Sequence, residues 1–77
     1  MQQSFKDMAQ RIENAEKAFR EVVQQTTGCD EAAANKVLRL YVKERLAKVD
    51  VGIGAVQVKH GALLGRDVLL RAIDMAS

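Results

Sequence analysis

The sequence predicts an α+β domain that is mainly helical, in the order helix, helix, β-hairpin, helix. Three observations carry this prediction. Apolar side chains recur at helical spacing over residues 4–27, 30–47 and 66–76. Two short Val-rich runs within 49–60 alternate apolar and polar residues on either side of a Gly-Ile-Gly, which is typical of a hairpin. A length of 77 residues favours one domain.

The first predicted helix begins at Ser4, where Asp7 follows in a capping-box arrangement. It ends before Gly28, a residue suited to a left-handed C-cap. Its apolar positions are spaced alternately three and four residues apart, as in a heptad repeat. These positions are Phe5, Met8, Ile12, Ala15, Phe19 and Val22. The helix is about 35 Å long at 1.5 Å per residue, so we expect the stripe to pack on the domain's own core, or also on a second copy.

The second predicted helix follows Asp30, a good N-cap residue, and has two distinct faces. The apolar face carries Ala34, Val37, Leu38 and Tyr41. The basic face carries Lys36, Arg39 and Lys43 with no acid among them, and Lys48 and Lys59 follow in the hairpin. A basic stripe of this kind is either an ordinary solvated face or a binding surface for an anionic partner.

In the hairpin, Gly52 and Gly54 are expected to supply positive φ angles at the turn. A phosphate-binding glycine loop would require a helix after it, whereas here a strand follows. In the last helix one apolar face is broad, and Leu70 and Met75 extend beyond it. We therefore expect this helix to be buried on two sides, by the hairpin and by the first helix or a partner subunit.

Catalytic and metal sites are not expected. Cys29 is the only cysteine and His60 the only histidine, which excludes an internal disulfide and a zinc site built from four such ligands. A reactive Cys29 thiol near a helix N-terminus is the one alternative to a structural cysteine. The carboxylates show no paired spacing, so we expect no enzyme, cofactor, metal or small-molecule substrate. No apolar run is long enough to span a bilayer and no signal peptide is recognisable, so a cytoplasmic protein is expected.

The segment "VLRLYVKERLAKVD", followed by "VGIGAVQV", resembles the recognition helix and first wing of winged helix-turn-helix domains. The resemblance implies that the second helix and the hairpin bind duplex DNA. The sequence departs from that family because only "TTGCD" precedes the second helix, in place of a short additional helix. The segment "VKHGALL" also resembles small bacteriophage and prophage proteins, which implies an accessory or regulatory protein in the bacterial cytoplasm.

Two functions remain open. In the first, Lys36, Arg39 and Lys43 contact DNA, Lys48 and Lys59 flank them, and Asn35 and Arg39 read base edges. In the second, an apolar helical surface binds or inhibits a host protein, which suits a net charge of only +2. A homodimer is expected with either function. The candidate interface residues are Phe5, Met8, Ile12, Phe19, Val22, Leu70 and Met75.

Overall fold

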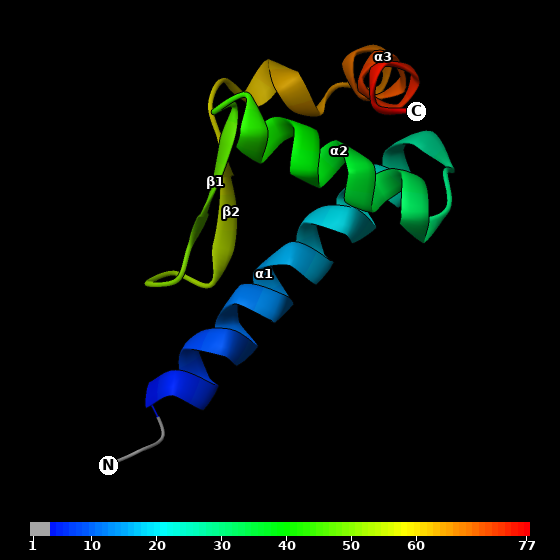
Figure 1. Ribbon diagram of the computed structural model, residues 1–77. Helices are drawn as coiled ribbons and strands as arrows, with labels where there is room; N and C mark the ends of the chain where they lie inside the picture. Colours follow the sequence, from blue (N-terminus) through cyan, green and yellow to red (C-terminus); the bar gives the residue numbers. More distant parts are fainter. Residues whose placement is uncertain (1–3) are drawn as a thin grey trace.

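The computed structural model describes residues 4–77, which form three α-helices and a two-stranded antiparallel sheet (Figure 1). The elements in order are α1 (Ser4–Thr27), α2 (Glu31–Lys43), β1 (Ala47–Asp50), β2 (Ala55–Val58), a short 3-10 helix η1 (Gly61–Leu64) and α3 (Arg66–Ala76). The mainly helical α+β fold and its element order are therefore confirmed. The prediction of a second helix reaching residue 47 is wrong, and η1 was not predicted.

The turn between α1 and α2 follows the predicted capping chemistry. Gly28 has a φ of 74° and its N–H donates to the carbonyl of Gln24 at 2.7 Å, which closes the last turn of α1. The Asp30 side chain accepts a hydrogen bond from the N–H of Ala33 at 2.8 Å, so it caps α2. These two caps allow the chain to reverse within three residues.

The core lies where the C-terminal half of α1 meets α2 and α3. The predicted apolar face of α2 is fully confirmed, since Ala34, Val37, Leu38 and Tyr41 are all buried. The rings of Phe19 and Tyr41 meet edge to face, with centroids 5.8 Å apart. The Tyr41 hydroxyl donates to the carbonyl of Leu63 at 2.5 Å, which ties α2 to η1. Burial raises the pKa of Tyr41.

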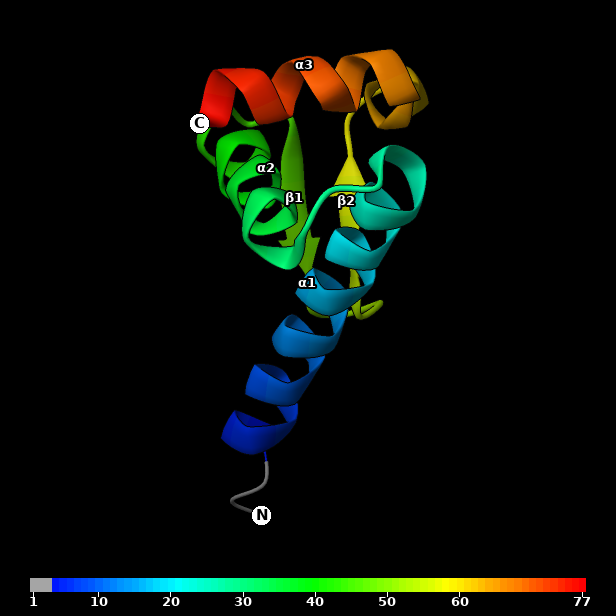
Figure 2. The same ribbon diagram turned by 90° about the vertical axis from the view of Figure 1, so that its right-hand side faces the viewer.

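Two packing expectations are corrected. In α1 the buried valine is Val23 rather than Val22, because Val23 lies about 40° around the helix from Phe19 and Val22 about 60° to the other side. In α3 the buried side packs across α2 and α1, as Figure 2 shows, and not against the hairpin. The hairpin packs against α1 and α2 instead.

The hairpin has one apolar face and one polar face because its register sets apolar residues opposite apolar residues and polar residues opposite polar residues. Val49 pairs with Val56 on the face toward the helices, and Lys48 pairs with Gln57 on the outer face. At the turn, Gly54 has the expected positive φ of 64° but Gly52 does not. Gly52 instead provides room, because an added Cβ would lie 3.2 Å from Oδ1 of Asp50. That oxygen accepts from the Gly52 N–H at 2.9 Å.

The overall shape is elongated, with extents of 45 × 23 × 18 Å. Figures 1 and 2 show why, since the N-terminal half of α1 projects beyond all the other elements. Within the described residues no helix is long and apolar enough to cross a membrane.

Candidate nucleic-acid interface

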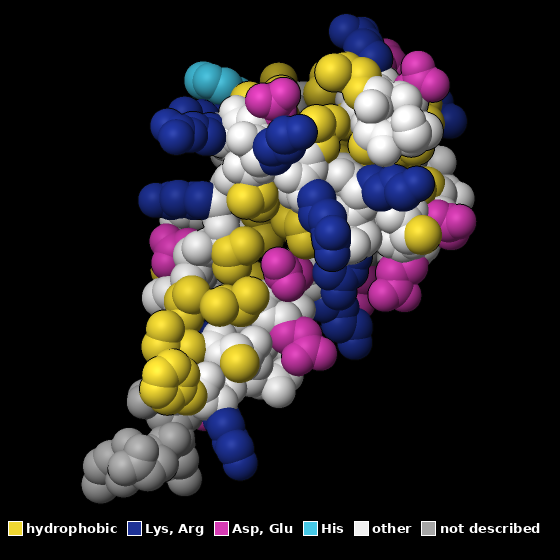
Figure 3. Space-filling model, viewed as in Figure 1, with side chains coloured by type: hydrophobic (Ala, Val, Ile, Leu, Met, Phe, Trp, Pro, Cys, Tyr) yellow, Lys and Arg dark blue, Asp and Glu magenta, His cyan; other side chains and the backbone are white. Residues whose placement is uncertain are grey.

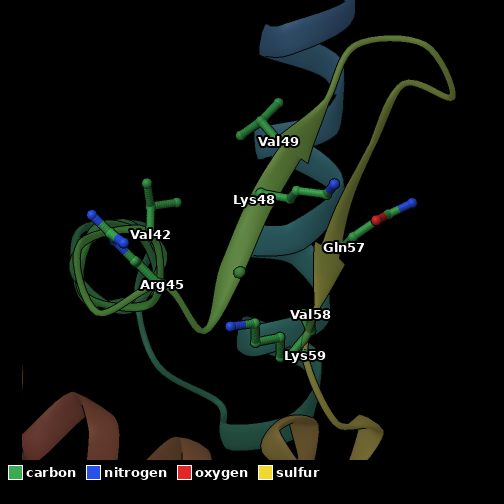
Figure 4. A pocket seen from close by; sticks show the side chains of 8 residues that line it. Val42, Arg45, Lys48, Val49, Gln57, Val58 and Lys59 are labelled. Carbon is green, nitrogen blue, oxygen red and sulfur yellow. The ribbon is translucent and has the colours of Figure 1, made fainter.

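An open hollow of about 520 Å³ lies between the end of α2 and the hairpin (Figure 4). Its apolar part is formed by Val42, Ala47, Val49 and Val58, and its polar part by Arg45, Lys48, Gln57 and Lys59. Figure 4 shows Val42 on α2 and Val49 on β1 on either side of the gap between these elements. The three basic side chains come from three different segments: the end of α2, β1, and the residue after β2.

A second hollow of about 350 Å³ adjoins the first along α2. The two share Val42 and Val49, so they are neighbours along α2 and β1. The second hollow adds Arg39 and Lys43 on the wall, together with Asn35, Leu38 and Glu16. We call the whole surface the basic groove. Its basic residues are Arg39, Lys43, Arg45, Lys48 and Lys59.

The charged side chains of the basic groove are mostly positive. All five of its basic side chains are exposed, and Glu16 is the only acidic residue among those that line it. Figure 3 shows Lys and Arg side chains spread along α2 and at the hairpin on this face of the molecule, with acidic side chains between some of them. A groove whose charges are mostly of one sign and whose floor is apolar concentrates counter-charged ligands at its surface.

The hairpin register positions Lys48 and Lys59. Both lie on the outer face because side chains alternate along a strand and Lys48 is paired with Gln57. The N–H of Lys59 donates to the carbonyl of Leu46 at 2.8 Å, which extends the pairing beyond the last residues of the strands. Lys59 is therefore held beside the end of α2 by a backbone hydrogen bond.

Arg45 is positioned by the way in which α2 ends. The N–H of Leu46 donates to Tyr41 at 2.8 Å and the N–H of Arg45 donates to Val42 at 3.1 Å, which is the Schellman arrangement. Arg45 therefore occupies the left-handed position, with a φ of 59°, where glycine is the usual residue. This motif ends the helix at Lys43 and directs the chain into β1.

The sequence-predicted contact residues divide into two groups. Arg39, Lys43, Lys48 and Lys59 all lie on the basic groove. Lys36 is exposed one turn earlier on α2 and lines neither hollow. Asn35 lines the second hollow, but it is half-buried and its Oδ1 accepts a hydrogen bond from Arg20 at 3.4 Å. Arg45 was missed, although its place directly after the basic helix was a usable signal.

Cys29 and His60 do not come together. Cys29 lies just before the N-terminus of α2. His60 lies near the other end of this helix, because the preceding residue, Lys59, is hydrogen-bonded to Leu46, which follows the C-terminus of α2. The two residues are therefore separated by the length of a 13-residue helix, about 20 Å. A Cys–His nucleophilic pair is excluded by this placement. Among residues 4–77 no group of three or more His, Cys, Asp or Glu side chains could hold a metal ion.

The predicted interface residues also differ in their surroundings. Phe19 is buried in the chain's own core, and Ile12 is half-buried. The remainder are exposed, namely Phe5, Met8, Val22, Leu70 and Met75.

No family model, curated protein or solved structure matches this chain.

Proposed function

We propose that this protein is a small, non-enzymatic DNA-binding protein, a phage or bacterial regulatory accessory, that holds a DNA backbone along the basic groove. The observation that carries the proposal is the convergence of five exposed basic side chains on one groove, from α2, from the turn that ends it, from β1 and from the residue after β2. A phosphate backbone is a row of single negative charges, and basic side chains from several segments along a groove match that row.

The floor of the groove fits the same ligand. Val42 is 44% exposed and, with Val49, forms an apolar strip between the basic walls. Deoxyribose carbons can pack on such a strip while the phosphates on either side contact the lysine and arginine heads. Arg39, with its planar guanidinium, is the side chain best suited to reach a guanine edge from this surface.

Salt provides the first test. Five phosphate contacts imply a slope of about −4.5 for the logarithm of the binding constant against that of salt concentration. Affinity for duplex DNA should then fall by about 10²–10³ between about 50 and 200 mM salt. Fluorescence anisotropy with labelled random-sequence duplex measures this directly. An affinity independent of salt would reject a phosphate-binding groove.

A matched pair of triple variants separates the groove from overall charge. The groove variant is Arg45→Ala with Lys48→Ala and Lys59→Ala, and the control is Lys17→Ala with Arg66→Ala and Arg71→Ala. Both lower the net charge by three at exposed positions. We expect the groove variant to lose low-salt binding and the control to retain most of it. Equal losses would mean that general charge, and not the groove, attracts DNA.

A protein partner is the second candidate, and exposed apolar side chains favour it. Phe5, Met8, Ile53 and Met75 are all exposed on the described surface. If the wild-type protein fails to bind duplex DNA at low salt, this candidate replaces the first. Its interface would be nearly insensitive to salt, because apolar contacts are not screened.

A further inference from the structure

Two side-chain amides line the basic groove, and only one of them is free to contact a ligand. Asn35 is half-buried and accepts a hydrogen bond from Arg20. Gln57 lines the first hollow and is exposed, and none of the side-chain hydrogen bonds within residues 4–77 involves it. An amide carries donors and an acceptor side by side, so Gln57 can form a pair of hydrogen bonds with one ligand group.

Gln57 lies on the outer face of the hairpin, opposite Lys48. The register pairs these two residues directly across the strands, which sets their Cβ atoms about 5 Å apart. Figure 4 shows both side chains projecting from neighbouring strands on the side away from α2. The free amide is therefore held beside a lysine, on the side of the basic groove opposite α2.

The outer face of the hairpin is open to a ligand. The helices pack on the other face, where Val49 and Val56 lie. Asp50 is the only acidic residue of the two strands, and its Oδ1 accepts a hydrogen bond from the N–H of Gly52 at 2.9 Å. This carboxylate is engaged by the turn, whereas the Gln57 amide has no such partner.

We propose that Gln57 reads an adenine base from the major groove of the DNA that the basic groove holds, an inference that rests on the proposed function. In the major groove adenine presents an acceptor at N7 beside a donor at N6, which matches the paired donor and acceptor of a glutamine amide. In the minor groove an A·T pair presents only acceptors in either orientation. The amide therefore distinguishes adenine from thymine only when it approaches through the major groove.

The dimensions of the hairpin favour the same groove. Its strands lie about 5 Å apart, and their side chains widen the ribbon beyond the width of the minor groove, about 6 Å. The major groove is about 12 Å wide and admits a two-stranded ribbon. In this placement Lys48 beside the amide, and Lys59 just after β2, lie near the phosphates that border the groove.

Selection from a randomised duplex pool at about 50 mM salt is the first test. We expect the wild type to enrich sites with adenine at one fixed position, and Gln57→Ala to lose that preference, which should amount to about 10- to 100-fold in affinity. Because the amide is uncharged, Gln57→Ala should keep the wild-type salt slope with random-sequence duplex. Gln25→Ala, at an exposed glutamine of α1, is the control and should keep the preference.

The outcomes of this selection separate the role of Gln57 from the proposed function. A wild type that binds no duplex at all overturns both. A wild type that binds duplex without any base preference, or with an adenine preference that Gln57→Ala retains, overturns only the role of Gln57. The phosphate-binding groove would then stand on its own salt dependence.

Base analogues in the selected site test which DNA groove is read. Replacing adenine by 7-deazaadenine removes the acceptor of the major groove, and 3-deazaadenine removes that of the minor groove. Anisotropy should show that 7-deazaadenine weakens the wild type by about 3- to 10-fold and leaves Gln57→Ala unchanged. A loss with 3-deazaadenine alone, or an equal loss with 7-deazaadenine in the wild type and in Gln57→Ala, would overturn the reading of adenine by Gln57 from the major groove.

Discussion

Replacing Arg45 by glycine should make the protein more stable and, at the same time, a weaker DNA binder. Arg45 has a φ of 59° at the end of α2. A residue with a Cβ destabilises the folded state by about 1–2 kcal/mol in that conformation, and glycine removes this cost. Glycine also gives the unfolded chain more conformational freedom, which offsets about 0.5–1 kcal/mol of the stability gained. We expect Arg45→Gly to raise the free energy of unfolding by about 0.5–1 kcal/mol, or Tm by about 3–6 °C.

Arg45→Ala is the matched control for this effect. It removes the same charge and the same exposed side chain, but it keeps a Cβ in the left-handed conformation. Urea unfolding should therefore rank Arg45→Gly above Arg45→Ala in stability. Anisotropy should show the two variants equally weakened in DNA binding, each with a salt slope lower by about one. If Arg45→Gly is the less stable of the two, the assigned backbone cost is wrong.

Three further changes test the fold. Gly54→Ala should lower the free energy of unfolding by about 1 kcal/mol because of its φ of 64°, as chemical denaturation would show; an unchanged midpoint would contradict this. Phe19→Ala should lower it by about 3–4 kcal/mol because the ring is buried against Tyr41, and a loss below about 1 kcal/mol would place the ring outside the core. The raised pKa of Tyr41 means that the unfolded chain ionises first. The stability contributed by this group should therefore be intact below a pH of about 10 and lost as the pH rises through the pKa of folded Tyr41. Thermal melts measured over this pH range should show the loss, and Tyr41→Phe should reduce it.

Much of the helical structure could be predicted because helix bounds and buried faces depend on local spacing. The bounds of α1 and α3 and the buried face of α2 follow from apolar periodicity and from the caps at Gly28 and Asp30. The end of α2 could not be predicted in this way. Glycine is absent there, and the left-handed turn at Arg45 is held by the backbone hydrogen bonds of the Schellman motif, from Leu46 to Tyr41 and from Arg45 to Val42.

The basic groove could be predicted only as a set of residue types. The sequence indicated Arg39, Lys43, Lys48 and Lys59 because bases on one helix face and in a nearby hairpin are visible from spacing alone. It could not indicate that Val42 and Val49 form a floor between them. That feature depends on how the hairpin lies against α2, which is set by long-range packing on α1.

The most direct test of the proposed function is the anisotropy titration of the two triple variants with duplex DNA at about 50 mM salt, where phosphate contacts are strongest. Our account predicts that the variant lacking Arg45, Lys48 and Lys59 loses binding, while the control of equal net charge keeps it. Equal binding by the two variants would contradict the assignment of the basic groove as the DNA-binding surface.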